Sequence, residues 1–325
     1  MTIRTLIEEL GRAPDGDRRL RRLADDGVLS AVQLASMRQG RAVFVLFAGA
    51  ITTPAAVVKV DHDPRYRPRL LAEHSVLQAL RHLPAVAGSV PEPLGLAVSA
   101  PRVALAQSGL PGTPLNLLMR RRPRPAQRYG EADHRLVLEW LARLHAEPSP
   151  GTTVLRSAAV LDAVERGVGR TPAAVRFARE VRAMGEVFAD VELPLLPGHG
   201  DLGSTNLLLD GDAVGVCDWE GGSGARPPLA DIVLFLNHYG RALPTPAYRL
   251  PARLDAFRAT FVDDGWLARL TARSLAHHLA HVGLDAEAAE YLFIATLADL
   301  AAGSAPTAHA RSTTRFWTSA LRTYA

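Results

Sequence analysis

The stretch that decides the fold is His199-Gly200-Asp201-Leu202-Gly203-Ser204-Thr205-Asn206, followed further along the chain by Asp218-Trp219-Glu220. Between the two motifs, the segments 206–209 and 213–217 are typical of short strands, and the residues that join them, Asp210-Gly211-Asp212, are typical of a turn. A hairpin over these residues brings Asn206 and Asp218 together.

This order of side chains favours phosphoryl transfer. An in-line displacement on a nucleotide γ-phosphate requires a carboxylate at the acceptor hydroxyl, together with oxygen ligands that hold Mg²⁺. Asp201 supplies the first, and Asn206 and Asp218 supply the second. Turns also favour Asp and Asn for conformational reasons alone. That alternative explains each residue singly, but it does not explain their order along the chain.

Lys59 is the only lysine in a chain whose lysines and arginines total 37. Because the chain otherwise uses arginine as its cation, a lone lysine indicates a place for a compact point charge. It lies in a buried-strand pattern, and the helical pattern 70–80 that follows carries Glu73. We expect Glu73 to pair with Lys59, which grips the nucleotide phosphates as the corresponding lysine of kinases does. The alternative is a snorkelling strand lysine and a solvated glutamate.

Length and hydropathy limit the class of protein. At 325 residues the chain exceeds the usual size of one domain, so two lobes are expected. Its mean hydropathy is +0.04, and no run of 18 apolar residues predicts a membrane span. Residues 1–30 lack the apolar segment of a secretory signal, which predicts a cytoplasmic protein. The single cysteine, Cys217, lies in an apolar strand pattern and is interpreted as a small buried hydrophobe.

The charge pattern argues against a nucleic-acid partner. The sequence pI is about 9.6, but the formal net charge is only +4 and the arginines are scattered. The densest basic cluster, Arg120-Arg121-Arg122-Pro123-Arg124, favours a solvated loop. Steering of an anionic substrate is the alternative for this cluster.

The periodicity changes along the chain from strands to helices. Residues 1–27 are expected to form a helical extension, and strands are expected at 32–37, 42–48, 55–60 and 102–106. Further helices are expected at 136–146, 161–166, 173–188, 229–239, 250–262, 267–281, 286–301 and 313–321. The expected fold class is α+β, with the extension and a nucleotide-binding N-lobe over 1–106, a Gly/Pro-rich linker over 107–114, and a helical C-lobe over 115–325 that holds the catalytic loop, the metal site and the acceptor pocket.

With these segments in order, the chain resembles the aminoglycoside phosphotransferase and choline kinase branch of the protein-kinase-like superfamily over nearly its whole length. The segments that carry the resemblance are 57–60, Glu73, 109–115, 141–146, 199–206, 218–220 and 228–231. The resemblance implies a bilobal kinase-like fold with a small β-rich N-lobe and a larger helical C-lobe. It also implies a small-molecule phosphotransferase that uses ATP or GTP and Mg²⁺.

The resemblance assigns a role to each candidate residue. Asp201 is the catalytic carboxylate, and Asn206 and Asp218 are the ligands of Mg²⁺. Asp231 supports the catalytic loop from the start of a helix. The residues expected to bind the nucleotide are Gly40, Lys59, Glu73, Gln107 and Gly109.

Two segments depart from the family pattern. The phosphate-covering turn has only Gly40 and no G-x-G-x-x-G, and Leu202-Gly203 replaces the His-Pro often found after the catalytic carboxylate. The sparse turn motivates a competing hypothesis of a kinase-fold nucleotide-binding protein that lacks turnover. A metabolic kinase of the choline, sugar or homoserine type and a helical interaction protein with incidental motifs are further alternatives.

The remaining candidate residues leave their roles open. Glu220 follows Asp218 and is expected either in the second shell of the metal or at a backbone turn. His277, His278 and His281 lie near one another, but they lack a full zinc ligand set and are expected to pack or to line the substrate pocket.

The acceptor is predicted from charge. The segment 221–325 carries eight acidic residues against ten arginines, so it does not form the strongly acidic wall that a polycationic aminoglycoside would select. We therefore expect a neutral or anionic hydroxyl-bearing acceptor, such as a nucleoside-like molecule, a sugar or another natural product. An antibiotic inactivated by phosphorylation is one such acceptor.

Overall fold

The computed structural model describes residues 2–25, 29–35, 40–49, 53–99, 102–123, 126–146, 151–243, 249–303 and 308–325. The chain divides into two compact units, the first formed by Met1–Leu115 with Thr205–Ser223 and the second by Asn116–Ser204 with Gly224–Ala325. The first is rich in strands and the second in helices, as the predicted α+β class requires. Among the described helices, none has the length and apolarity needed to cross a bilayer.

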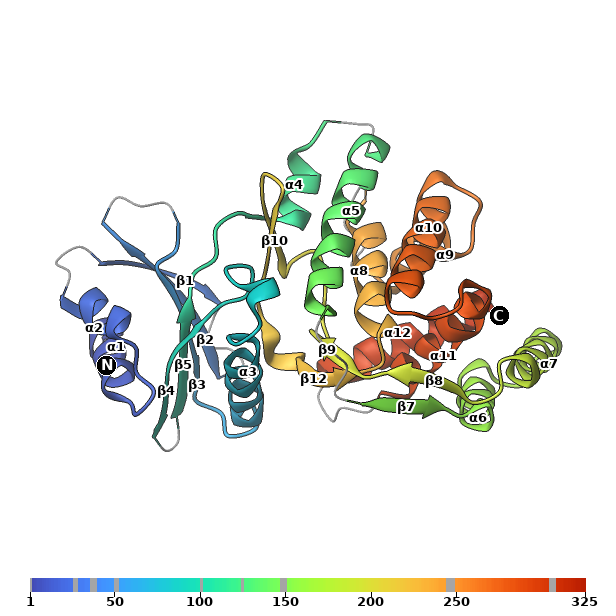
Figure 1. Cartoon of the computed structure of the whole chain (residues 1–325), viewed down its shortest axis with the longest axis horizontal. Coiled ribbons are helices and arrows are strands. Elements are labelled where there is room, and N and C mark those ends of the chain that lie inside the picture. Colours follow the sequence, from blue (N-terminus) through green and yellow to red (C-terminus); the bar gives the residue numbers. More distant parts are fainter. Residues whose placement is uncertain are drawn as a thin grey trace. The chain divides into compact units, whose positions relative to one another are not determined.

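The first unit is built on a five-stranded antiparallel sheet in the order β1-β2-β3-β5-β4 (Figure 1). Its strands are β1 (Leu29–Ala35), β2 (Arg41–Ala48), β3 (Ala56–Asp61), β4 (Pro93–Ser99) and β5 (Arg102–Ser108). On β3, Lys59 pairs in register with Val43 of β2 and Leu105 of β5. Because side chains alternate along a strand, Val57 and Lys59 lie on one face and Val58 lies on the other.

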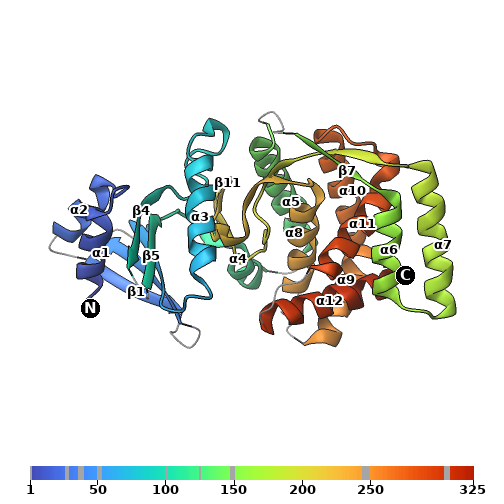
Figure 2. The same ribbon diagram turned by 90° about the horizontal axis from the view of Figure 1, so that it is seen from below.

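Helices cover both faces of this sheet. Helices α1 (Ile3–Arg12) and α2 (Arg18–Asp25) share a buried core with Val58 and its neighbours on that face. Helix α3 (Arg67–Leu80) buries Leu70 against Leu105 on the opposite face. Figure 2 shows α1 and α3 on opposite sides of the strands. The helix that carries Glu73 therefore lies on the same face as Lys59.

Strand β4 is not among the strands expected from the sequence, and the prolines of Pro91-Glu92-Pro93 at its start are typical of a turn. Proline is tolerated as the first residue of a strand, where Pro93 stands. Gly95 then allows a close approach, since a Cβ at this position would lie 2.8 Å from the carbonyl oxygen of Leu10. Strand β1 begins three residues before its predicted start, and the last two residues of that prediction, 36 and 37, lie outside the described residues.

The predicted hairpin is present. Strands β10 (Leu207–Asp210) and β11 (Ala213–Val216) are antiparallel, and Gly211 has a φ of 59° in the turn between them. Strand β10 also pairs with β6 (Thr113–Pro114). These contacts place the hairpin in the first unit, whereas the sequence grouped it with 115–325. The predicted linker 107–114 likewise contains the end of β5 and all of β6.

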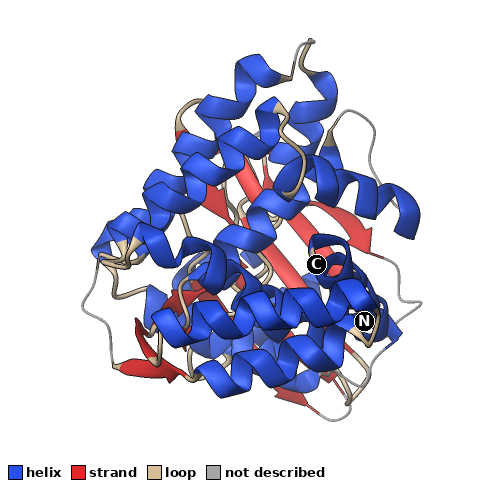
Figure 3. Cartoon of the chain, turned by 90° about the vertical axis from the view of Figure 1, so that its right-hand side faces the viewer, coloured by secondary structure: helices blue, strands red, loops and turns tan. Residues whose placement is uncertain are grey.

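The second unit is a bundle of helices with two small sheets (Figure 3). Its helices are α4 (Leu115–Arg121), α5 (Gln127–Leu144), α6 (Ser157–Val168), α7 (Pro172–Val187), α8 (Leu229–Ala242), α9 (Leu250–Phe261), α10 (Trp266–His281), α11 (Ala289–Ala302) and α12 (Ala308–Tyr324). Phe257, Phe316 and Trp317 lie in its main hydrophobic core.

Five elements of the second unit were not predicted: α4, β7 (Thr152–Leu155), β8 (Val191–Pro194), β9 (Leu196–Gly198) and β12 (Ser223–Arg226). Each has seven residues or fewer, which is too short for a periodic pattern to establish itself.

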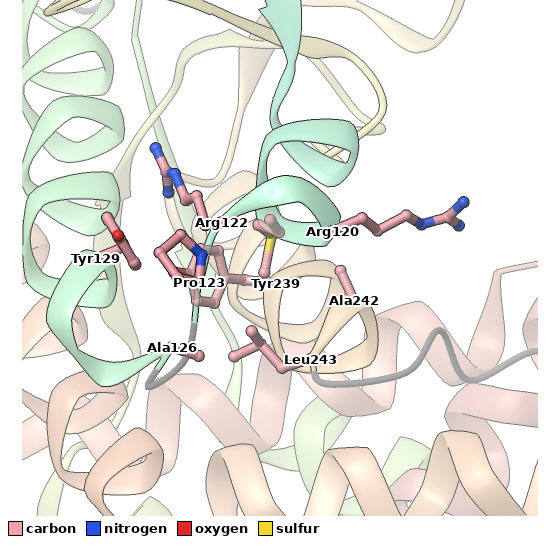
Figure 4. A pocket seen from close by; sticks show the side chains of 9 residues that line it. Arg120, Arg122, Pro123, Ala126, Tyr129, Tyr239, Ala242 and Leu243 are labelled. Carbon is pink, nitrogen blue, oxygen red and sulfur yellow. The ribbon is translucent and has the colours of Figure 1, made fainter.

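The interpretation of the basic cluster as a loop was wrong for Arg120 and Arg121, which are exposed but helical, whereas Arg122 lies in a bend that follows the helix. Arg120 and Arg121 form the last turn of α4. The Nη1 atom of Arg122 lies 2.7 Å from Oδ1 of the buried Asp133, and the hydroxyl of Tyr239 donates to Oδ2 of the same carboxylate over 2.8 Å. Figure 4 shows Arg122 and Tyr239 beside a small cavity of about 120 Å³. Arg122 is therefore half-buried and paired with a buried carboxylate of the bundle.

Candidate active site

Lys59 and Glu73 form a buried ion pair in the first unit. The Nζ atom of Lys59 lies 2.7 Å from Oε1 and 2.9 Å from Oε2 of Glu73. Lys59 is 5% exposed and Glu73 is fully buried. Burial by itself lowers the pKa of Lys59, but the charges of Glu73 and Asp218 outweigh it and raise that pKa above the ordinary range. The ammonium is therefore charged and fixed in position at neutral pH.

Asp218 is held on a strained turn beside this pair. Its φ of 69° and ψ of 58° lie in the left-handed region, which costs energy for a residue other than glycine. Its Oδ1 atom accepts a hydrogen bond from Nζ of Lys59 over 2.5 Å. The next residue, Trp219, is buried, and its backbone N–H donates to Oε1 of Glu73 over 3.2 Å. The packing of Trp219 therefore fixes the direction of the Asp218 carboxylate.

Glu220 lies in the short turn Trp219–Gly221 and makes ion pairs that the sequence did not predict. Its carboxylate pairs with Arg41 over 2.5 Å and with Arg69 over 3.5 Å. Arg41 also pairs with Asp61, which is 1% exposed, over 2.9 Å. Burial alone would lower the pKa of Arg41, but Asp61 and Glu220 raise it. Glu220 thus ties the Asp218 turn to the ends of strands β2 and β3.

A cavity of about 520 Å³ lies within the first unit, next to these side chains. Apolar residues of β1, β2 and β3 line it, including Val32, Val45 and Val57. Its polar lining includes Lys59, Gln107, Thr205, Asn206 and Asp218. An apolar slot with a cation and an acid at one part of its wall suits a ligand with one apolar and one anionic end.

Gln107, on β5, is one of the polar residues that the sheet presents to this cavity. Its side chain is 2% exposed, and its Oε1 atom has no hydrogen-bond partner among the described residues. A buried amide oxygen without a partner costs free energy unless a ligand or water supplies a donor. Gln107 is therefore available to a bound molecule.

The other two predicted nucleotide-binding glycines are not among the described lining residues of the cavity. Gly40 has a φ of 76°, and its carbonyl accepts from the backbone N–H of His62 over 2.7 Å. Gly109 lies against Pro54, so that a Cβ at this position would be 2.0 Å from the Pro54 carbonyl oxygen. Both glycines therefore have a role in backbone packing, and a contact with nucleotide remains a prediction for them.

Cys217 differs from its interpretation as a buried strand residue. Strand β11 ends at Val216, and Cys217 is half-buried and lines the cavity. Its backbone N–H donates to the carbonyl of Asn206 over 3.0 Å, which holds the two ends of the hairpin together. Burial, reinforced by the charge of Asp218, raises the pKa of the thiol to about 11.

The raised pKa predicts a weakly reactive thiol. Because the thiolate is the nucleophile, Cys217 should react with iodoacetamide more slowly than free cysteine at pH 8, and its rate should still be rising at pH 10. Mass spectrometry of the alkylated protein measures both rates. A rate that levels off below pH 9 would contradict the assignment.

The loop of the second unit that carries Asp201, the predicted catalytic residue, is held by Asp231, in the first turn of α8. The Oδ2 atom of this buried carboxylate accepts from the backbone N–H of His199 over 2.5 Å, and Oδ1 accepts from that of Gly200 over 2.7 Å. Gly200 has a φ of 77°, a conformation that favours glycine. The next residue, Asp201, presents an exposed side chain. The support that the sequence expected from Asp231 is present in the geometry.

Two of the three histidines of α10 make hydrogen bonds to backbone carbonyls. The Nε2 atom of His278 lies 3.0 Å from the carbonyl oxygen of Pro228, and that of His281 lies 3.2 Å from the carbonyl oxygen of Ala142. Within the described ranges, no three His, Cys, Asp or Glu side chains gather in a group that could hold a metal ion. The packing role expected for these histidines fits His278, which is buried, whereas His277 and His281 are exposed.

Sequence reasoning missed the residues that support the site. Arg41, Asp61 and Arg69 are distant from Glu220 in the sequence, so no local spacing could connect them. Trp219 did offer a weak signal. A tryptophan between two carboxylates has a large apolar surface, so its side chain is expected to pack into a core.

Comparison with known proteins identifies the class. Residues 30–266 match the sequence profile of the phosphotransferase enzyme family, APH. No curated protein sequence matches the chain. A thermostable variant of the aminoglycoside phosphotransferase APH(4)-Ia, solved with ADP and hygromycin B, has 14% identity and a TM-score of 0.53, with 95% of this chain and 99% of that chain covered. A second variant of that enzyme, solved with AMP-PNP and hygromycin B, has 16% identity and a TM-score of 0.51, with 92% and 95% covered.

The family match spans more than half of the chain, so this protein belongs to the phosphotransferase enzyme family. It is a small-molecule phosphotransferase with the kinase-like fold that the sequence predicted, and the structural likeness supports the fold alone. The resemblance stated from the sequence is thereby confirmed.

Proposed function

We propose that this chain transfers the γ-phosphate of ATP or GTP to a hydroxyl group of a neutral or anionic small molecule. The observation that carries the proposal is the cavity of the first unit, where Lys59, Asn206 and Asp218 line a wall of an otherwise largely apolar slot. Membership of the phosphotransferase enzyme family supports phosphoryl transfer as the reaction of these residues.

The residues of the cavity fit a nucleotide. The valines of β1, β2 and β3 offer an apolar surface for the base, and the unpartnered Oε1 of Gln107 offers a hydrogen-bond acceptor there. The charged Nζ of Lys59, fixed by Glu73, is suited to the α- and β-phosphates. Gln107 and Lys59 thus recognise opposite ends of one ligand.

Asn206 and Asp218 would hold Mg²⁺. They supply an amide oxygen and a carboxylate, both hard ligands, and Mg²⁺ is commonly bound by one or two carboxylates together with substrate phosphates and water. A site of this kind needs no dedicated cage of protein ligands, in agreement with the absence of one from the described residues. When bound, Mg²⁺ neutralises charge that develops on the transferred phosphoryl group.

Asp201 supplies the acid–base group. Its exposed carboxylate follows two backbone N–H groups that Asp231 holds, so the loop has a fixed conformation at the point where Asp201 projects. In the proposed reaction this carboxylate orients the acceptor hydroxyl and accepts its proton as the oxygen attacks phosphorus.

Replacing Asp218 with asparagine should raise the Mg²⁺ concentration that gives half-maximal activity. The change removes one anionic oxygen from the shell of a hard cation while it keeps the size of the side chain. A titration of activity against Mg²⁺ measures the shift, and Asp212→Asn on the exposed hairpin turn is the matched control. An unaltered titration would exclude Asp218 as a ligand.

The acceptor class rests on the charge of residues 221–325. The eight acidic residues and ten arginines of 221–325 do not select a polycation, so we propose a sugar, nucleoside-like or other natural-product hydroxyl, an antibiotic among them. A metabolic kinase of a small alcohol uses the same site and differs only in its acceptor.

Nucleotide consumption against a library of hydroxyl-bearing molecules, with and without Mg²⁺, tests the proposal. The expected result is Mg²⁺-dependent consumption that one structural class of acceptor stimulates, with ATP and GTP assayed in parallel. If nucleotide binds but is not consumed with any acceptor, the competing hypothesis of a nucleotide-binding protein without turnover is favoured. A preference for kanamycin-type polycations over every neutral or anionic acceptor would overturn the acceptor class alone.

A further inference from the structure

Two arginines of the second unit share one aromatic ring. The guanidinium carbons of Arg241 on α8 and Arg253 on α9 lie 5.8 Å and 4.1 Å from the ring centroid of Phe316 on α12. Because both lie on one ring, the two guanidinium carbons are no more than about 10 Å apart. Like charges at this range repel each other, most strongly where water is partly excluded, and an anion bound beside them would relieve the repulsion.

The structure supplies no carboxylate to Arg253 among the described residues. No ion pair or hydrogen bond is present on its guanidinium there, and its Nε atom is buried without a partner. Burial, followed by the charge of Arg241, lowers the pKa of Arg253 to about 10. The segments 244–248 and 304–312, which flank these helices in sequence, read Pro-Thr-Pro-Ala-Tyr and Ser-Ala-Pro-Thr-Ala-His-Ala-Arg-Ser and contain no acidic residue.

The nearest acidic residue along α9 does not serve as the counter-ion. Asp255 is exposed and lies two positions after Arg253, which places it roughly 200° around the helix. The exposed Arg258, one turn further along, does have an acidic neighbour, because its guanidinium lies 3.8 Å from Asp263. Of these two arginines on α9, Arg258 therefore has an acidic partner, and Arg253 has none among the described residues.

This basic pair lies close to the catalytic loop. Gly203, two residues after Asp201, packs against the ring of His238, since a Cβ at Gly203 would lie 2.8 Å from its Nδ1. Arg241 follows His238 by three residues, roughly 4.5 Å along α8 and on the same side of the helix. Burial lowers the pKa of His238 to about 3, and the charges of Arg241 and Arg253 contribute to that shift. The positive field of the pair therefore reaches the residue that contacts the loop.

Asn237, on α8, is a second buried polar residue whose side chain lacks a partner. Asn237 is 1% exposed, and neither its Oδ1 nor its Nδ2 has a hydrogen-bond partner among the described residues. It precedes Arg241 by four residues, so the two side chains share a helix face. An amide and two guanidiniums along adjoining turns form a set of donors suited to an oxyanion.

We infer that the acceptor of the proposed phosphotransferase carries an anionic group, a carboxylate or a phosphate, that the guanidiniums of Arg241 and Arg253 bind next to the catalytic loop. The inference rests on the proposed function and narrows its acceptor from a neutral or anionic molecule to an anionic one. The hydroxyl to be phosphorylated and the bound anion belong to the same molecule.

The test begins with sulfate as a probe, because sulfate binds without reacting. A non-hydrolysable ATP analogue with Mg²⁺ first saturates the nucleotide cavity, and its own shift of the melting temperature shows whether nucleotide binds at all. Sulfate at low millimolar concentration is then compared with chloride at equal ionic strength. We expect the wild type to be stabilised by sulfate, and the apparent affinity to fall roughly 10- to 100-fold in Arg253→Met, the usual worth of a charge-assisted hydrogen bond.

Two further variants make this result decisive. Arg258→Met removes an exposed arginine from the same helix and should leave the sulfate effect unchanged. Arg253→Lys keeps the charge on Phe316 and should retain part of the affinity, which separates anion binding from misfolding. Equal stabilisation in wild type and Arg253→Met, or none in the wild type, overturns the inference.

Acceptor pairs provide the second arm. A neutral sugar is assayed beside its uronic acid and its sugar phosphate, each with a free hydroxyl, and kcat/KM is compared within the set. We expect the anionic members to exceed the neutral one in the wild type and to lose that advantage in Arg253→Met. Transfer to neutral acceptors with no preference overturns the inference and leaves the proposed function standing, whereas the absence of transfer to any acceptor removes the proposed function itself.

Discussion

Asp201→Ala should lower kcat by roughly 10²- to 10⁴-fold, which is the usual worth of a positioned acid–base group. Nucleotide affinity should change little, because the nucleotide is assigned to the cavity that Lys59, Gln107 and Asp218 line. Steady-state kinetics measure kcat, and calorimetry with a non-hydrolysable nucleotide measures affinity.

The control for this variant is Asp210→Ala, the same change at an exposed position at the end of β10. It should leave kcat within a factor of about two, as expected for a surface substitution. Full turnover in a folded Asp201→Ala protein would remove the carboxylate from the mechanism.

Lys59→Arg should lower kcat/KM by about 10²- to 10³-fold although it keeps the charge, a loss similar to that of one preorganised electrostatic contact. The Nζ atom lies 2.7 Å from Glu73 and 2.5 Å from Asp218 at a position that is 5% exposed. A planar guanidinium is larger than this space and cannot present a compact charge to both carboxylates. Kinetics with nucleotide as the varied substrate give the ratio.

Arg102→Lys is the matched control, since it exchanges the same two residue types in the same sheet. Arg102 lies on β5, where its guanidinium pairs with Glu9 of α1. This variant should retain its kinetics, and thermal unfolding of both proteins shows whether the fold survives. A Lys59→Arg enzyme with normal kcat/KM would make the solitary lysine an accident of composition.

The sequence is sufficient to bring together the polar residues of the candidate site, because these residues are either close to one another along the chain or of a rare type. Asn206 and Asp218 lie at the ends of one hairpin, so a turn signal and two short apolar runs suffice to bring them together. Lys59 is identified by being the only lysine, and Glu73 by its place in the next helix. The support from Asp231 was expected from the family resemblance, and the structure places this residue in the first turn of a helix.

The parts that escaped prediction depend on contacts distant in sequence. Glu220 is neutralised by Arg41 and Arg69, which no periodicity can foresee in a chain with arginines throughout. The short strand β4 begins with proline, whose turn propensity outweighed the apolar residues that follow it. The hairpin joined the first unit through two ladder residues of β6, a pairing too short to leave a pattern. Propensity in these places was overridden by tertiary contacts.

The central claim is that the γ-phosphate leaves a nucleotide and arrives on a hydroxyl. The most direct measurement incubates the protein with γ-³²P-labelled ATP or GTP, Mg²⁺ and the acceptor library, and separates products by chromatography. The account predicts label on an acceptor as an acid-stable phosphate ester, dependent on Mg²⁺ and reduced roughly 10²- to 10⁴-fold in Asp201→Ala. Label that appears only as inorganic phosphate, or that reaches the acceptor equally well in Asp201→Ala, would contradict it.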